Sequence, residues 1–115
     1  MKTRVITVPQ NKKAMIALDF DEAKDEDLIQ FSLNEVEFKK LWDYNFFMTI
    51  NNLVDVNIDD YEDENILDNK KLKKIIESNV FDNPIYDDEI LPTIINIKNL
   101  FFEALNRQTG VFFFF

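Results

Sequence analysis

Two segments near the N-terminus alternate apolar and polar residues with the period of two that half-buried β-strands require. Residues 13–20 (KAMIALDF) and 28–33 (LIQFSL) each direct every second side chain to one face. We expect these segments to pair as a β-hairpin, with residues 21–27 as its loop. A shorter apolar run, residues 5–8, precedes Pro9 and predicts an additional edge strand, because proline cannot donate a ladder hydrogen bond.

Between residues 34 and 55 the apolar spacing changes to three and four, which predicts helical structure. Ser32 followed by Glu35 fits a capping box at the start of this region, in which a hydroxyl and a carboxylate satisfy amides left open at a helix start. The pattern fits one long helix as well as two short ones. A further helix is predicted over residues 69–79, with its lysines outward and three apolar side chains inward: Leu72, Ile75 and Ile76.

The clearest helical periodicity lies between residues 90 and 106, where apolar side chains form two stripes and leave a narrow polar strip. A helix that is apolar over so much of its circumference packs against neighbours on two sides. Pro92 near its start is compatible with a helix, because the amides of a first turn have no intrahelical partner. Gly110, the only glycine, follows where a left-handed residue that ends the helix is expected.

The last five residues, 111–115 (VFFFF), are all apolar, which predicts a strand covered on both faces. An exposed edge of phenylalanines would promote aggregation, so we place this strand centrally, beside the N-terminal hairpin. The predicted fold class is α+β, with an N-terminal β-hairpin and a C-terminal strand in one small sheet packed against about three helices. No repeat or linker divides the chain, so residues 1–115 are expected to form a single domain.

The composition excludes several functional classes. Twenty-two acidic residues against 13 basic ones give a formal net charge of −9, which argues against binding to nucleic acid or to an anionic membrane. The absence of cysteine and histidine removes thiol nucleophiles, disulfides, most zinc sites and the imidazole of hydrolytic triads. No group of residues specifies a reaction or a cofactor, so we expect a protein that is not an enzyme. The sequence shows no signal peptide or membrane segment, and we expect a cytoplasmic protein.

Most of the negative charge lies in two blocks. Residues 19–27 hold six acids and one lysine, and residues 55–68 hold seven acids and no base. Carboxylates so close together repel one another, which lowers stability unless something offsets the repulsion. The second block also contains apolar residues that would anchor a binding partner, namely Ile58, Tyr61 and Ile66. We therefore interpret it as an interaction surface, with an ordinary solvated loop as the alternative.

Part of the second block is similar to the calcium loop of helix–loop–helix proteins. Four side chains fall on ligand positions one, three, five and nine of that loop: Asp55, Asn57, Asp59 and Asp63. The sixth position of the loop requires glycine and the twelfth a bidentate glutamate, whereas this chain has Asp60 and Ile66 there. We therefore expect no metal site, and a metal-binding protein stays an alternative function only.

Several segments in the second half of the chain together resemble a known group of proteins. The segment NIDDYEDENI (57–66) is followed by the helix LKKIIE (72–77), by a helix that ends near Asn106 and by the strand VFFFF. This combination resembles small bacterial immunity proteins, which accompany contact-dependent growth-inhibition systems and related polymorphic toxins. The resemblance implies an α+β protein that binds one cognate toxin domain, often a nuclease, and blocks its active site or the approach of its substrate.

The expected toxin-binding residues come from the two acidic blocks. Toxic nucleases are basic where they meet phosphate, so an acidic surface would attract them over long distances and speed association. We expect the main contact at Asp59, Asp60, Tyr61, Glu62, Asp63 and Glu64. The secondary candidate is the loop of the predicted hairpin, with Asp21, Glu22, Asp25, Glu26 and Asp27. The same charge pattern also fits an acidic inhibitor that mimics DNA and blocks a nucleic-acid-binding enzyme.

Overall fold

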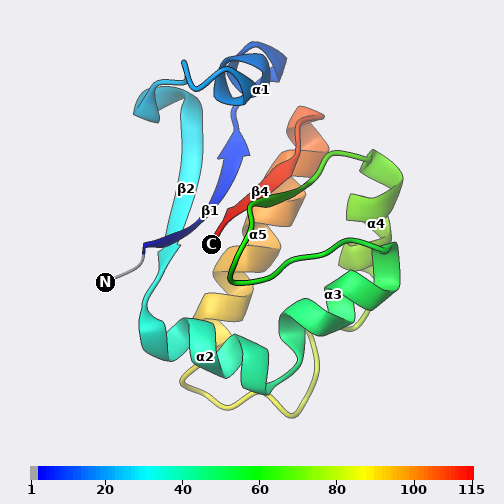
Figure 1. Ribbon diagram of the computed structural model, residues 1–115. Coiled ribbons are helices and arrows are strands. Elements are labelled where there is room, and N and C mark those ends of the chain that lie inside the picture. The colour runs from blue at the N-terminus through cyan, green and yellow to red at the C-terminus, as the bar shows by residue number, and fades with distance from the viewer. Residues whose placement is uncertain (1–2) are drawn as a thin grey trace.

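A four-stranded antiparallel sheet in the order β2-β1-β4-β3 forms the centre of the fold. The computed structural model describes residues 3–115. Its strands are β1 (Arg4–Pro9), β2 (Leu28–Leu33), β3 (Glu64–Ile66) and β4 (Val111–Phe114). The first and last of these strands lie side by side in the middle of the sheet, as Figure 1 shows. The central position predicted for the C-terminal strand is therefore confirmed.

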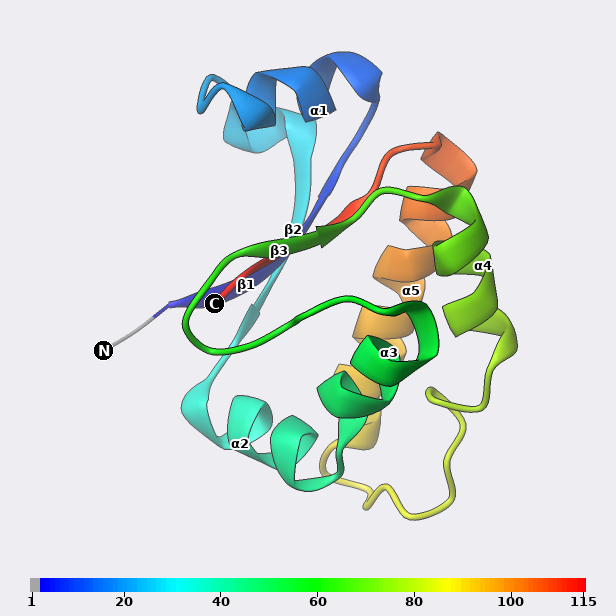
Figure 2. The same cartoon turned by 45° about the vertical axis from the view of Figure 1, so that its right-hand side comes forward.

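Within residues 3–115 the structure has five α-helices and one short 3-10 helix, namely α1 (Lys12–Asp19), η1 (Asp25–Asp27), α2 (Glu35–Asp43), α3 (Phe46–Val54), α4 (Asn69–Glu77) and α5 (Leu91–Arg107). Helix α5 lies across one face of the sheet and contacts β1, β2 and β4. On the same side, α4 packs against α5, α3 against α4, and α2 against α3, whereas α1 stands apart at the end of β1 (Figures 1 and 2). The predicted α+β class is confirmed, with five helices in place of three.

The side chains of β4 alternate between two different environments. Val111 and Phe113 are fully buried on the face that the helices cover, and Phe115 just beyond the strand joins them. Phe112 and Phe114 point to the opposite face, where their rings stack with centroids 6.0 Å apart. Phe114 is only half-buried, so the second face of the strand is covered less completely than the unbroken apolar run predicts.

The predicted N-terminal hairpin is wrong in its first strand. Residues 12–19 form α1 rather than a strand, and β2 pairs with β1 instead. The side chain of Asn11 caps α1 by accepting a hydrogen bond from the Ala14 amide at 2.8 Å. The same segment also has apolar residues three and four apart, Ala14, Ala17 and Leu18, which fit one side of a short helix, and the cap favours the helix. β1 is consequently a central strand and not an edge strand, and residues 20–27 connect α1 to β2.

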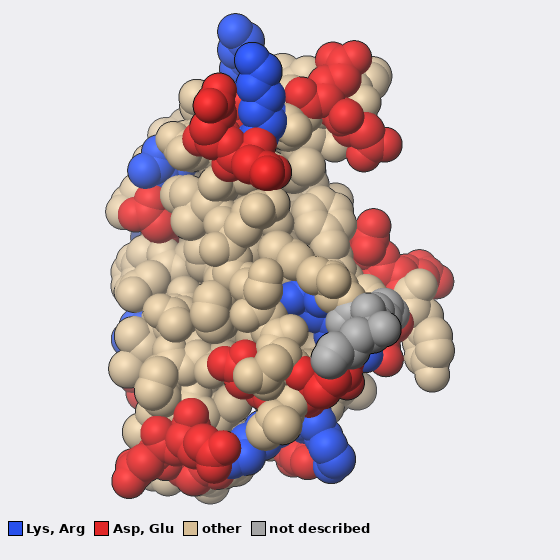
Figure 3. Space-filling view, turned by 90° about the vertical axis from the view of Figure 1, so that its left-hand side faces the viewer, with Lys and Arg blue, Asp and Glu red and all other residues tan. Residues whose placement is uncertain are grey.

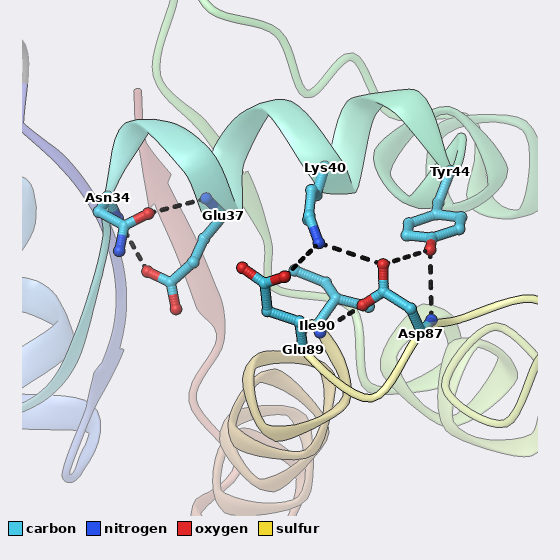
Figure 4. Close-up of polar contacts among 7 residues, drawn as sticks. All are labelled: Asn34, Glu37, Lys40, Tyr44, Asp87, Glu89 and Ile90. Atoms are coloured by element: carbon cyan, nitrogen blue, oxygen red, sulfur yellow. Dashed lines mark hydrogen bonds and ion pairs between the residues drawn. The ribbon is translucent and has the colours of Figure 1, made fainter.

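The predicted helical region in the middle of the chain is divided into two short helices. The chain turns between them at Asn45, whose φ of 60° is left-handed and cannot continue a helix. Helix α2 does begin with a capping box, formed by Asn34 and Glu37 rather than by the predicted Ser32 and Glu35. The Asn34 side chain accepts from the Glu37 amide at 2.8 Å, and the Glu37 carboxylate accepts from the Asn34 amide at 2.9 Å (Figure 4).

The two helices predicted in the second half of the chain are confirmed. Helix α4 occupies residues 69–77 and buries Leu72 and Ile75, and α5 occupies residues 91–107 with Pro92 in its first turn. The buried side chains of α5 face both the sheet and α4, in accordance with its wide apolar surface. None of the helices formed by residues 3–115 combines the length and the apolar character that crossing a membrane requires.

The glycine that precedes β4 has a role different from the predicted one. Helix α5 ends at Gln108, which adopts a left-handed φ of 55°, whereas Gly110 has no positive φ. A Cβ atom at Gly110 would lie 2.4 Å from Cδ2 of Leu67 and 2.9 Å from the carbonyl oxygen of Ile66. Gly110 is therefore required because the end of β3 passes close to it, and its own dihedral angles would suit other residues.

We predict that substitutions at these two positions change stability in opposite directions. Gly110→Ala should lower the free energy of unfolding by about 1–3 kcal/mol, because the Ile66 carbonyl belongs to a paired strand and cannot move aside easily. Gln108→Gly should raise it by about 0.5–1 kcal/mol, since glycine adopts a positive φ without side-chain strain. Urea denaturation measures both changes. A Gly110→Ala variant as stable as the wild type would contradict the close approach.

Candidate interaction surface

The acidic loop, which we define as residues 55–63 between α3 and β3, is fastened to α3 by a single side chain. The Ile58 amide donates to the Asn51 side-chain oxygen at 2.8 Å, and the Asn51 side-chain nitrogen donates to the Ile58 carbonyl at 3.0 Å. Both Ile58 and Ile66 are 1% exposed and belong to the core. They are therefore not the partner anchors that we expected, whereas Tyr61 is 90% exposed.

Two of the predicted contact residues maintain the shape of the acidic loop. One carboxylate oxygen of Asp59 accepts hydrogen bonds from the amides of Tyr61 and Glu62, at 2.8 and 2.9 Å. The Glu64 carboxylate accepts from the Asn57 amide at 2.9 Å, across the base of the loop. These bonds satisfy backbone donors that the turn leaves without a strand partner. The side chains of Asp59 and Glu64 are thus engaged within the loop.

Asp60 joins the acidic loop to the start of the sheet. Its carboxylate forms an ion pair with Arg4 at 3.0 Å, and Arg4 also hydrogen-bonds to Glu35 at the start of α2. The Arg4 guanidinium carbon lies 4.0 Å from the centroid of the Phe38 ring, and the whole residue is only 7% exposed. The bond to Asp60 raises the pKa of Arg4, followed by the bond to Glu35, against the opposing effect of burial. The Asp60 carboxylate is therefore engaged within the molecule and stabilises the fold.

The other predicted contact residues are exposed on the surface. Glu62 and Asp63 lie beside Tyr61 in the acidic loop and point to solvent. In the second segment the side chains of Asp21, Glu22, Asp25 and Glu26 are exposed, and Asp27 is half-buried. Gln10 holds this segment to the end of β1 through bonds to the carbonyls of Glu26 and Asp27, at 2.7 and 2.9 Å.

Two adjoining hollows on the face of the sheet away from α5 bring parts of both acidic blocks together. The first, of about 150 Å³, is lined by Leu18, Asp19, Asp63, Glu64, Asn65, Phe112 and Phe114. The second, of about 190 Å³, shares three of these residues and adds Met15, Ile16 and Leu67. We call the two hollows together the acidic groove. Its floor is formed by the outward phenylalanines of β4, and its rim carries Asp19 from α1 and Asp63 from the acidic loop.

The acids of the secondary candidate all lie outside the acidic groove. Glu22 and Asp27 line a different hollow, of about 370 Å³, where Lys13 and Lys24 offset part of their charge. Asp21, Asp25 and Glu26 line neither this hollow nor the acidic groove. In the acidic groove the two acidic blocks therefore meet only through Asp19, which was not among the predicted contact residues.

Sequence reasoning also missed the aromatic floor of the acidic groove. Phe112 and Phe114 were expected to be buried inside the protein, which is correct for Phe112 at 8% exposure and wrong for the half-buried Phe114. Their alternation with Val111, Phe113 and Phe115 was the available signal, since alternate residues of any strand face opposite sides of a sheet. Phe112 and Phe114 therefore lie on the face of the sheet away from α5, where no helix covers β4 completely.

A separate polar cluster fixes α2 to the segment before α5 (Figure 4). The Tyr44 hydroxyl donates to Asp87 at 2.8 Å, and Lys40 forms ion pairs with Asp87 and Glu89, both at 3.1 Å. The amide of Ile90 donates to the other Asp87 oxygen at 2.8 Å. The Ile90 amide, then Tyr44 and Lys40, lower the pKa of Asp87 from 3.8 to about 2. The members of this cluster bind one another, which indicates a structural role.

The structure offers little support for a metal site. Among residues 3–115, no three acidic side chains lie together in a way that would hold a metal ion. The carboxylates that fitted calcium-ligand positions serve other purposes, because Asp59 accepts two backbone amides and Asp63 lies on the rim of the acidic groove. The segment 55–66 thus forms a loop whose carboxylates diverge instead of converging on one point.

Comparison with known proteins assigns no family to this chain. Comparisons with protein-family models, with curated proteins and with solved structures found no match. No residue role can therefore be transferred from a relative. The functional assignment of the acidic groove depends on its own shape, charge and exposed apolar area.

We predict that two neighbouring acids of the loop differ in their effect on stability. Asp60→Ala should lower the free energy of unfolding by on the order of 1 kcal/mol, because Arg4 loses a partner while staying buried. Glu62→Ala is the matched control, because its exposed side chain should change stability by less than about 0.5 kcal/mol. Thermal and urea denaturation compare the two. Equal stabilities would contradict the structural role of Asp60.

We predict that Asp87 makes a pH-dependent contribution to the free energy of unfolding. Since its folded-state pKa of about 2 lies below the ordinary 3.8, ionised Asp87 stabilises the fold above about pH 4, and this contribution is lost as the pH falls toward 2. Asp87→Asn should therefore be less stable than the wild type at neutral pH, and the difference should shrink between pH 4 and pH 2. Asp88→Asn, at the exposed neighbouring position, is the control. A constant difference across this range would contradict the assignment.

Proposed function

We propose that this chain is an immunity protein that binds and neutralises a cognate bacterial toxin domain with a basic active-site surface, such as a nuclease. The observation that carries the proposal is the acidic groove. Its rim combines carboxylates from both acidic blocks, and its floor is formed by Phe112 and Phe114. This combination suits a protein partner that presents basic side chains around an apolar one.

Negative charge and the apolar floor of the acidic groove contribute differently to binding. A net charge of −9 accelerates the encounter with a basic partner, and this effect weakens as salt is added. In the floor, the half-buried Phe114 supplies contact that slows dissociation, because apolar area removed from water stabilises a complex independently of salt. Phe112 is 8% exposed and adds little. Exposed apolar side chains at the edge of the groove extend this contact area, namely Ile16 at 59% and Leu67 at 46% exposure.

The geometry supports an immunity protein better than a DNA mimic. A mimic of DNA requires many carboxylates directed outward, in place of phosphates. In the acidic loop, Asp59 and Glu64 accept backbone hydrogen bonds and Asp60 pairs with Arg4, so fewer carboxylates point outward than the composition indicates. An apolar floor between charged rims is also of little use for imitating a phosphate backbone.

We predict that charge reversal on the rim of the acidic groove weakens toxin binding. The partner to be tested is any toxin domain encoded beside the gene for this chain, and its affinity is measured by calorimetry. The double variant Asp19→Lys with Asp63→Lys should bind about 100-fold more weakly, because both substitutions place like charges opposite basic partner residues. The control, Asp43→Lys with Asp88→Lys, changes net charge equally at exposed positions outside the groove.

The two parts of the proposal fail in different ways. If the rim and control variants lose affinity equally, only the net charge matters and the assignment to the acidic groove is wrong. If the wild-type chain neither binds the neighbouring toxin domain nor protects cells that express it, the immunity function itself is wrong.

A further inference from the structure

Strand β2 forms one outer edge of the sheet, and its edge has none of the usual protection. The order β2-β1-β4-β3 leaves one side of β2 without a neighbouring strand in the described part of the chain. Its six residues, LIQFSL, contain no charge, no proline and no glycine. Natural edge strands are normally protected by lysine, proline, a bulge or a covering element, because an open edge pairs readily with other chains.

The register identifies which backbone groups this edge presents. The Gln10 amide donates to the Asp27 carbonyl at 2.9 Å, which extends the β1–β2 pairing by one residue. Hydrogen-bonded pairs of an antiparallel ladder recur at every second residue, so Ile29 and Phe31 direct their backbone groups toward β1. The N–H and C=O groups of Gln30 and Ser32 consequently point away from β1. They are spaced to receive one additional strand.

The side chains along the edge would also gain from an added strand. Ile29 and Phe31 pack against the core but stay half-exposed, and Gln30 and Ser32 are exposed on the opposite face. Figure 3 looks onto the side of the molecule where β2 lies, and charged residues are sparse across the middle of this surface, with acidic and basic groups above and below it. A strand placed there would cover the remaining apolar area of Ile29 and Phe31 and would add backbone hydrogen bonds.

The charges at the ends of β2 indicate what kind of strand fits. Three acids lie directly before β2 and two follow it, but Glu35 pairs with Arg4 and the Glu37 carboxylate caps α2. The outward negative charge is therefore concentrated at the start of β2, on the exposed side chains of Asp25 and Glu26. A second copy of this chain, paired antiparallel about a two-fold axis, would place residues 25–27 of each copy near Glu35 and Glu37 of the other. Since Arg4 is already engaged by Glu35, the exposed carboxylates of Asp25 and Glu26 gain no basic partner in such a pair, and they favour a segment with a basic residue at the end that meets them.

From this edge and these charges we infer that β2 binds an extended segment of the toxin by β-strand addition, with lysine or arginine at the end of that segment that meets Asp25 and Glu26. The identity of the partner rests on the proposed immunity function, whereas the edge itself is a property of the fold. Backbone pairing along β2 provides affinity, and the terminal basic residue provides register and preference over neutral strands.

The first experiment uses a synthetic probe and needs no toxin. The peptide acetyl-Lys-Val-Thr-Val-Thr-Val-Lys-amide is titrated into the isotopically labelled chain and followed by amide NMR. The amides of Gln30 and Ser32 should shift and exchange more slowly with solvent, because they become hydrogen-bonded. The same peptide with glutamate in place of lysine should bind about tenfold more weakly. Absence of shifts at Gln30 and Ser32, or equal binding of the two peptides, would overturn the inference.

Proline substitution tests the backbone directly. Gln30→Pro removes an outward N–H without disturbing the bonds to β1, and proline is tolerated at such edge positions. It should weaken binding of the lysine peptide about tenfold, whereas Gln30→Thr, which keeps the amide, should bind as the wild type does. Circular dichroism checks that each variant is folded, and Ser32→Pro provides the same test if Gln30→Pro is not. Unchanged affinity of a folded proline variant would exclude strand addition.

The toxin experiment separates this inference from the proposed function. If the wild-type chain protects cells and binds the neighbouring toxin domain while Gln30→Pro binds it equally well, the immunity function stands and the role of β2 is wrong. If no toxin binds while the peptide does, the edge is real and the proposed function is wrong. A wild-type dimer in sedimentation equilibrium that Gln30→Pro dissociates would show that a second copy, not the toxin, occupies the edge.

Discussion

The burial of β4 between β1 and β3 determines where the other elements of this fold lie. Its central ring, Phe113, is fully buried, with the rings of Phe47 and Phe101 both at centroid distances of 6.3 Å. Burial of each such ring contributes on the order of 1.5–3 kcal/mol, and edge-to-face contacts add to it. Helices α3 and α5 must therefore cover this strand on one side, and neighbouring strands must pair with both of its edges.

Some acidic residues of this chain stabilise the fold, and others project into solvent. Asp60 anchors a loop through Arg4, and Asp87 fixes the segment before α5 to α2. Each lies within a dense run of acids, where the sequence gives no sign that one member differs from its neighbours. The repulsion within these runs is thus partly relieved inside the molecule, and the acids that project outward are fewer and confined to particular places.

The sequence predicted long periodic elements better than short ones. Helix α5 spans 17 residues and offers enough turns for its apolar stripes to exclude a strand, whereas the eight residues of α1 fit both periods. Strand β3 has three residues, too few for any alternation to be visible inside an acidic segment. The prediction that the acidic blocks are exposed was correct for Glu62 and Asp63. The pairing of Asp60 with Arg4 joins residues 56 positions apart, and only the folded chain brings them together.

The central place of β4 also affects how the protein is made. Translation delivers β1 long before β4, although the two strands are neighbours in the sheet. While the chain is still growing, β1 can pair with β2 but has nothing on its other side. Folding of the core therefore waits for residues 111–114 to leave the ribosome, so truncated chains lack the strand that joins the two halves of the sheet. Only chains that include β4 can join β1 to β3 in one sheet.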